Sequence, residues 1–184
     1  RHMCIRYRHF SNSSLKVNIK PEIHTILCHA IIGSSGEKMS ISINLLKRVQ
    51  LFANLTSEEL ASVADICTAV PIASQEVIIH QNTTGTEMYI IAAGSVEVFI
   101  QGVDNARSLV VLGRGQVIGE MALIDQGYRS ASVKATREGA TLYLIERSQF
   151  YALCDQNNHI GFIVMRNLAI DIAFKLRHRN LAEL

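Results

Sequence analysis

The sequence predicts a mainly β protein: an antiparallel β-roll, similar to a jelly roll, with helices before it and a long helix after it. Three observations predict this fold class. Short runs rich in β-branched residues fill the middle of the chain, glycines separate these runs, and helical periodicity appears on both sides. Short strands with turn residues between them are typical of an antiparallel roll or sandwich.

Two N-terminal helices are expected ahead of the strands, at residues 44–55 and 56–68. Apolar residues in both segments recur at intervals of three and four, which places them on one face of a helix. Thr56 is followed three residues later by Glu59, which is the spacing of a capping box. We therefore expect the second helix to begin at Thr56.

The β-branched runs predict six strands of the roll. They cover residues 76–80, 88–92, 96–100, 108–112, 132–135 and 141–146. Glycine tolerates the backbone angles that tight turns require, so we expect the glycines between the runs to mark the turns. These glycines are Gly85, Gly94, Gly102, Gly113, Gly115 and Gly139.

The roll is expected at about residues 69–146 and the C-terminal helices at about 147–182. A short helix at 147–155 is followed by a long one at about 160–181, and this long helix is apolar on more than one side. One apolar stripe would be enough to cover the roll, so the second predicts a partner along the helix. We therefore expect a homodimer that forms through the C-terminal helix.

The composition is that of a globular protein. The chain has 184 residues, of which 48% are hydrophobic and 18% charged, which excludes a disordered chain. The formal net charge of +2 gives no argument for binding nucleic acid. No apolar run reaches the length of a membrane span. The four cysteines have no CxxC spacing, which favours reduced thiols in a cytoplasmic protein over a metal site.

Residues 1–40 are expected to form an N-terminal extension, partly derived from cloning or flexible, and residues 41–184 the folded domain. Arg1-His2-Met3 resembles a cloning remnant, and Met39 is a candidate initiator. The basic run at residues 6–9 is compatible with an arm that contacts nucleic acid or a membrane. A loosely packed extension is the favoured interpretation, because so short a run makes few phosphate contacts.

The candidate binding site is the run from Gly119 to Leu123, together with the basic residue that follows it. Gly119 lets the backbone approach a ligand closely. The amides of Met121 and Ala122 would be the unpaired N–H groups of a short helix, and such an end attracts anions. Arg129 offers a two-pronged cation to phosphate oxygens. Glu120 would repel phosphate but accept hydrogen bonds from hydroxyls, so the set predicts a ligand that carries both, as a nucleotide does.

These segments resemble the phosphate-binding cassette of cyclic-nucleotide-binding domains, as found in the catabolite activator protein and in protein kinase A regulatory subunits. Other segments resemble further parts of this family, in the right order. They are the entry helices at residues 45–60, the central hairpin at 88–98, and the turn and strand at 113–118. The ordered set covers about residues 42–184.

The resemblance implies roles for the individual cassette residues. Arg129 matches the arginine that pairs with the cyclic phosphate, and Glu120 the glutamate that accepts from the ribose 2′-hydroxyl. Ser130 and Ala131 follow the arginine and complete the phosphate site. Family members with threonine at this position tend to bind cGMP, so Ser130 favours cAMP over cGMP.

The resemblance also implies a base pocket. Val98 and Leu109 match the apolar residues that line it in the family, although both are equally compatible with an ordinary core. Arg179 and Asn180 lie where the last helix caps the base: Arg179 could stack on the ring and Asn180 could bond an adenine edge. A solvated basic helix end is the equal alternative.

The function implied is a regulatory sensor module that binds a cyclic mononucleotide and transmits the signal by movement of the C-terminal helices. The ligand is cAMP or cGMP, and no further cofactor or metal is expected. The transcription factors of the family continue into a helix-turn-helix, for which no residues remain after Leu184, so no DNA-binding domain is expected in this chain.

Two alternatives belong to other classes. A β-roll metalloenzyme would need histidines and carboxylates on facing strands, and His80 is the only histidine in a predicted strand. We therefore expect no enzyme. The second alternative is a nucleotide-free roll of the same family that serves as a dimerisation or interaction scaffold. Retention of both Glu120 and Arg129 argues against it.

Overall fold

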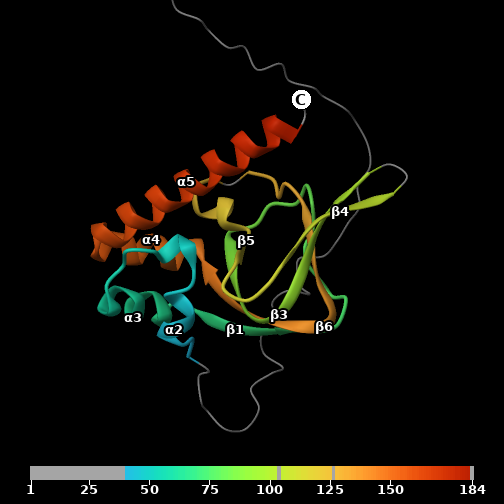
Figure 1. Cartoon of the computed structure of the whole chain (residues 1–184). Coiled ribbons are helices and arrows are strands. Elements are labelled where there is room, and N and C mark those ends of the chain that lie inside the picture. Colours follow the sequence, from blue (N-terminus) through green and yellow to red (C-terminus); the bar gives the residue numbers. More distant parts are fainter. Residues whose placement is uncertain (1–39, 103–104, 126, 183–184) are drawn as a thin grey trace, which may run out of the picture. The chain divides into compact units, whose positions relative to one another are not determined.

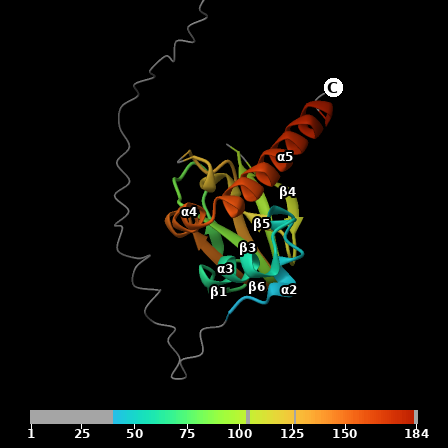
Figure 2. The ribbon, with the colours of Figure 1, turned by 90° about the vertical axis from the view of Figure 1, so that its left-hand side faces the viewer.

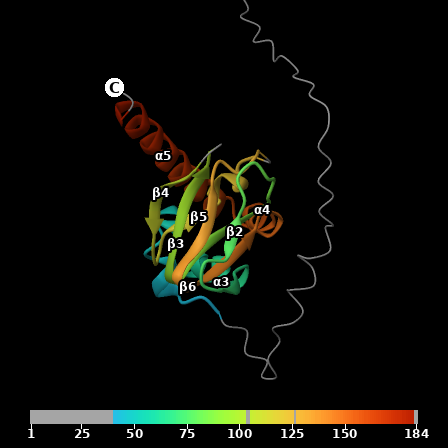
Figure 3. The same ribbon diagram turned by 90° about the vertical axis from the view of Figure 1, so that its right-hand side faces the viewer.

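The computed structural model describes residues 40–102, 105–125 and 127–182, with side chains as far as Arg177. The chain divides into two units, Arg1–Lys38 and Met39–Leu184, and the described residues all belong to the second. The expectations for the N-terminal extension, including the cloning remnant and the basic arm, lie outside the described residues. Within the second unit the helices gather on one side of a β-roll (Figure 1, Figure 2), and the opposite side is made by the strands (Figure 3).

The first helical region is broken into two short pieces, α2 (Ile43–Leu46) and η1 (Gln50–Phe52), so the single helix expected at residues 44–55 is wrong. The helix stops because Val49 is extended, with ψ 112°. Asn54 then takes a left-handed φ of 75°. A continuous helix would point the neighbouring side chains Leu51 and Phe52 in different directions, whereas both are buried in the core.

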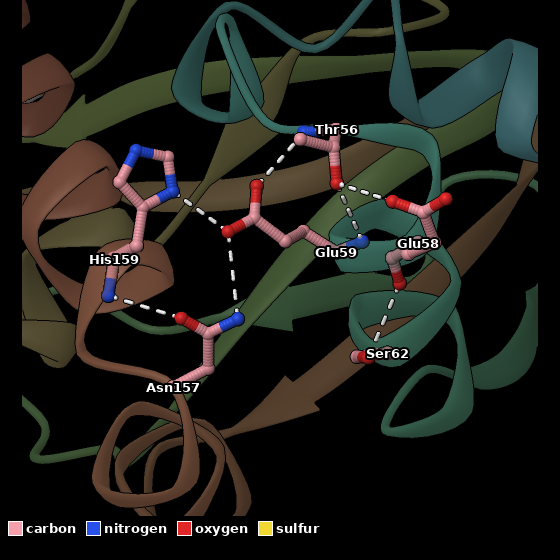
Figure 4. Close-up of polar contacts among 6 residues, drawn as sticks. All are labelled: Thr56, Glu58, Glu59, Ser62, Asn157 and His159. Carbon is pink, nitrogen blue, oxygen red and sulfur yellow. Dashed lines mark hydrogen bonds and ion pairs between the residues drawn. The ribbon is translucent and has the colours of Figure 1, made fainter.

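Helix α3 (Ser57–Asp65) begins at the predicted capping box. The amide of Glu59 donates to Thr56 Oγ1 at 3.2 Å, and the amide of Thr56 donates to Glu59 Oε2 at 2.8 Å (Figure 4). The same carboxylate reaches the junction of the last two helices, because Oε1 lies 2.7 Å from Nδ1 of His159 and accepts from Asn157 Nδ2 at 3.4 Å (Figure 4). The hydrogen bond from the Thr56 amide, and then those from His159 and Asn157, outweigh burial and lower the pKa of Glu59.

The six strands form one antiparallel sheet rolled up on itself, which confirms the predicted fold class. They are β1 (Thr68–Ile72), β2 (Val77–Ile79), β3 (Glu87–Gln101), β4 (Ala106–Leu112), β5 (Val117–Ile118) and β6 (Ser132–Glu146). The order is β1-β6-β3-β4, with β2 paired to β6 and β5 paired to β3. Strand β1 was not expected, since the helix was predicted to continue to Thr68. Its Pro71 is tolerated because β1 lies at the end of the strand order.

Two predicted turns are wrong, because Gly94 and Gly139 lie inside β3 and β6. Their φ angles are 70° and 71°, and the pairing of β3 with β6 shifts register on either side of Gly94. A Cβ atom on Gly94 would collide with the carbonyl oxygen of Gly139. The two glycines therefore bend both strands at the same level, and each pair of short predicted strands is one long strand with a bulge.

The two faces of the strands bury two separate apolar clusters. Alternate residues of β3 point to opposite faces, so Met88 and Ile90 pack under the helices while Tyr89 and Ile91 fill the inside of the roll. The inner cluster consists of Ile72, Ile79, Tyr89, Ile91, Val96, Ile118, Val133, Ala135, Ala140 and Leu142. The side chains that surround the candidate site therefore pack against a buried apolar cluster.

The chain closes with α4 (Arg147–Gln156) and α5 (Asn158–Ala182). The side chains of α5 that face the core are Ile160, Ile163, Val164 and Leu168. Asn167 is buried beside them, and its Nδ2 donates to the carbonyl oxygens of Leu51 at 3.0 Å and Ala53 at 2.9 Å. No helix within the described ranges is long and apolar enough to cross a membrane.

Replacement of Thr56 by Ala should lower the free energy of unfolding by about 1 kcal/mol, because the helix loses its N-cap acceptor. Urea unfolding followed by circular dichroism measures the change. Ser62→Ala is the matched control on the same helix, where an exposed hydroxyl bonds the carbonyl of Glu58, and should change stability by less than about 0.5 kcal/mol. Equal losses in the two variants would contradict the capping role.

Candidate functional site

A cavity of about 540 Å³ lies between the run that follows β5, the strands of the roll and α5. Nine of the residues predicted from the sequence line it. They are Val98, Leu109, Gly119, Glu120, Met121, Ala122, Arg129, Ser130 and Ala131. The side chains of Arg179 and Asn180 lie beyond the last side chain that the structure describes, so their role stays a prediction.

Gly119 follows β5 directly and is the N-cap of the short 3₁₀ helix η2 (Glu120–Leu123). It has a φ of 71°, in the left-handed region that glycine adopts without strain. The amide of Ala122 donates to the carbonyl oxygen of Gly119 at 3.1 Å. The expectation that this amide would be unpaired is therefore wrong, since a 3₁₀ turn satisfies an N–H group that an α-helix would leave open.

Arg129 is only 8% exposed, and its guanidinium makes three hydrogen bonds to other parts of the site. Nη2 donates to the carbonyl oxygen of Glu87 at 2.7 Å and to its Oε1 at 2.8 Å. Nη1 donates to the carbonyl oxygen of Gly119 at 3.2 Å. The arginine therefore joins the start of β3 to the start of η2.

The main chain of Arg129 is fixed by the loop that precedes β3. Its amide donates to the carbonyl oxygen of Thr83 at 2.8 Å, and its carbonyl accepts from the amide of Asn82 at 2.9 Å. Gly85, in the same loop, lies so close that a Cβ atom there would collide with Nη2 of the arginine. A Cβ on Gly119 would lie 2.5 Å from Nη1. The guanidinium thus fits between two glycines.

Glu87 is the partner that sequence reasoning missed. It pairs across the sheet with Glu146, and two opposed carboxylates are unfavourable unless a cation lies nearby. A buried arginine requires an acidic partner. Glu87, the acidic residue at the start of β3, was therefore the sequence signal that could have identified this partner. Burial, and secondarily the charge of Glu87, raises the pKa of Tyr89, so this hydroxyl stays neutral beside the ion pair.

Lys175 of α5 is the second partner that the sequence analysis did not identify. Its Nζ donates to Glu120 Oε1 at 2.9 Å and to Asp171 Oδ2 at 2.7 Å. Burial acts to lower the pKa of Lys175, but these two carboxylates outweigh it and raise the pKa above its usual value. Lys175 and Asp171 also line the cavity.

The other side of the cavity is apolar. Ile79 and Val133 are buried beneath it, and Val98, Leu109 and Leu112 extend the apolar surface toward β4. The arrangement suits a ligand with an anionic group near Arg129, a hydroxyl near Glu120, and an apolar or flat part against the strands. No group of three or more histidine, cysteine or acidic side chains suited to a metal occurs among the residues that the structure describes.

Comparison with known proteins agrees with this fold. Residues 69–157 match the family model described as cyclic nucleotide-binding domain. The matched region covers the strands of the roll, the cavity segment from Gly119 to Ala131, and α4. Residues 69–157 are therefore similar to the cyclic nucleotide-binding domain family, a family of regulatory, non-catalytic domains.

Two relatives illustrate the range of proteins that contain such a domain. The chain is 35% identical over 105 residues to the cyclic AMP receptor protein of Thermus thermophilus, which covers 56% of this chain and 46% of the relative. It is 31% identical over 119 residues to the cGMP-dependent protein kinase egl-4 of Caenorhabditis briggsae, which covers 64% of this chain and 16% of the relative. The chain therefore spans less than half the length of these relatives.

Solved structures show the same roll. The catabolite activator protein of Thermus thermophilus superposes with a TM-score of 0.65 at 31% identity, over 72% of this chain and 61% of that one. The N-terminal domain of a transcriptional regulator from Streptomyces coelicolor superposes with a TM-score of 0.64 at 26% identity, over 76% of this chain and 95% of that one.

Replacement of Glu87 by Gln should lower the free energy of unfolding by about 1–3 kcal/mol, because the buried guanidinium of Arg129 loses its compensating charge. Glu97→Gln is the matched control, since Glu97 pairs with Lys134 where both side chains are partly exposed, and it should cost less than about 1 kcal/mol. Urea unfolding of both variants provides the comparison, and a loss no greater at Glu87 than at Glu97 would contradict this account of the site.

Proposed function

We propose that this domain is a sensor that binds a cyclic mononucleotide, with cAMP preferred over cGMP, and transmits the signal by movement of α4 and α5. The observation that carries the proposal is the composition of one cavity. A buried guanidinium and a carboxylate lie at one end and apolar side chains at the other. A phosphate, a sugar hydroxyl and a base match these three surfaces in turn.

Each cassette residue has a role in this proposal. Arg129 pairs with the cyclic phosphate, and the exposed hydroxyl of Ser130, next to Ala131, supplements it. Glu120 accepts from the ribose 2′-hydroxyl. Met121 and Ala122 contribute through the backbone of η2.

The preference for cAMP rests on Ser130, since threonine at this position accompanies cGMP in the family. The relatives leave the preference open, because they include both a cyclic AMP receptor protein and cGMP-dependent protein kinases. The base would lie against Val98 and Leu109. A cap from Arg179 and Asn180 remains part of the proposal.

Transmission is supported by direct bonds between the end of η2 and α4. The hydroxyl of Tyr151 donates to the carbonyl oxygen of Leu123 at 2.8 Å, and Nη2 of Arg147 donates to that of Ile124 at 3.4 Å. A ligand that moves η2 toward the phosphate would therefore move α4 with it. A nucleotide that binds one arrangement of these elements more tightly shifts the population toward it.

Dimerisation through α5 is proposed from its exposed apolar side chains. Phe162 is 64% and Ile170 57% exposed, although both lie on a helix whose opposite side is buried in the core. A second copy of the helix would cover them. With this function we also propose a cytoplasmic location, where cyclic nucleotides act as signals.

Isothermal titration with cAMP, cGMP and AMP tests ligand binding. We expect saturable binding of a cyclic form, tightest for cAMP, and a loss of about thirtyfold or more in Arg129→Ala, because the phosphate loses a buried charge partner. Arg137→Ala removes an exposed arginine of β6 and should bind as the wild type does.

The control on the titration is protein shown to be free of carried-over nucleotide. Absence of heat with all three ligands in such protein would overturn the sensor function. The nucleotide-free scaffold would then be the better account of the fold.

Analytical ultracentrifugation tests the dimer. The wild type should sediment as a dimer, and Ile170→Glu should shift it toward the monomer, because the substitution places a charge in the apolar contact. Arg137→Glu, which changes an exposed charge on the roll, serves as the control. A wild-type monomer at high concentration would refute the proposed interface.

A further inference from the structure

The ammonium group of Lys175 lies between two carboxylates at the edge of the cavity. One belongs to Asp171, a turn earlier on α5, and the other to Glu120 at the start of η2. The contact with Asp171 is an i, i+4 pair along one helix. The contact with Glu120 joins residues 55 positions apart in the chain, so it is the one that links α5 to the site.

The Glu120 carboxylate needs such a partner for two reasons. Its side chain is 13% exposed, and a carboxylate removed from water is costly unless it is paired. It is also the residue that follows Gly119, whose carbonyl oxygen binds the guanidinium of Arg129. An uncompensated negative charge at this position would repel an anionic ligand held by that arginine.

The geometry of the pair leaves one carboxylate oxygen for a ligand. Lys175 contacts Oε1 of Glu120, and Oε2 is not part of this ion pair. An ionised carboxylate is an acceptor at both oxygens, so a hydroxyl can donate to Oε2 while the lysine stays on Oε1.

We propose that Lys175 is the positioning residue for recognition of the ligand's 2′-hydroxyl: it holds the Glu120 carboxylate in the cavity by one oxygen and offsets its charge, while the other oxygen accepts from the sugar. This role rests on the nucleotide-binding function proposed above. Lys175 does not compete with the ligand in this arrangement.

The consequence is a coupling between the ligand and the position of α5. Binding of the hydroxyl favours the carboxylate orientation that the lysine also favours, and the lysine is fixed to the helix by Asp171. Since such coupling is reciprocal, docking of α5 strengthens binding of the ribonucleotide to the same extent that the ribonucleotide strengthens docking.

The experiment is a thermodynamic cycle that combines substitution of Lys175 with removal of the 2′-hydroxyl from the ligand. Affinities for cAMP and for 2′-deoxy-cAMP are measured by titration calorimetry on the wild type, Lys175→Met, Lys175→Arg and Arg177→Met. Met keeps the length of the lysine without its charge, and Arg keeps the charge. Arg177→Met removes an exposed charge from the same helix at a position that does not line the cavity.

We expect Lys175→Met to lower the affinity for cAMP about fivefold, through the hydroxyl and the charge of Glu120 together, and that for 2′-deoxy-cAMP only about twofold, through the charge alone, which is the range of a partly exposed ion pair. Lys175→Arg should restore most of the affinity for cAMP. Arg177→Met should match the wild type with both ligands.

Two results would overturn the role of Lys175 while leaving nucleotide binding intact. Equal losses with the two ligands would show a general charge effect, and a gain in affinity for cAMP would show that the lysine competes with the hydroxyl. If the wild type bound neither nucleotide, the proposed function would fail, and the role of Lys175 with it. Nucleotide binding by the wild type therefore distinguishes failure of the Lys175 role from failure of the proposed function.

Discussion

The guanidinium of Arg129 is buried, and a buried charge is tolerated only where it is paired and hydrogen-bonded. Its acceptors come from two places distant in the chain, Glu87 at the start of β3 and the carbonyl of Gly119 at the start of η2. The loop before β3 binds the main chain of the same arginine and contributes Gly85, which leaves room for the side chain. One buried cation thus connects segments that are far apart in the sequence.

A second ion pair, between Glu120 and Lys175, completes the site with the opposite arrangement of charge. In the first pair the cation faces the cavity and the acid lies behind it; in the second the acid faces the cavity and a lysine of the closing helix supports it. The two charges offered to a ligand are thus each compensated within the protein. The site thus offers hydrogen-bond donors of a cation to an anionic group and an acceptor carboxylate to a neighbouring hydroxyl.

Local patterns predicted the features that depend on neighbouring residues. The capping box at Thr56, the roll and the run from Gly119 to Ala131 follow from spacing and residue type within a dozen positions. The partners Glu87 and Lys175 could not be found this way, because each meets its counterpart only through the closed roll and the packing of α5. The bends at Gly94 and Gly139 were mistaken for turns for a related reason: a glycine that ends a strand and one that bulges it look alike until the opposite strand is known.

The pairing of β6 has a consequence for how the protein is made. This one strand pairs with β1, β2 and β3, so three of the other strands have no complete ladder until residues 132–146 have left the ribosome. Contacts between segments so far apart in sequence form slowly, and strands that have not yet paired with β6 expose their apolar faces. Strands β1 and β2 therefore stay unpaired until β6 emerges, whereas β3 can pair with β4 and β5 first, and the interval before β6 emerges is the one in which a holdase chaperone would have most to bind.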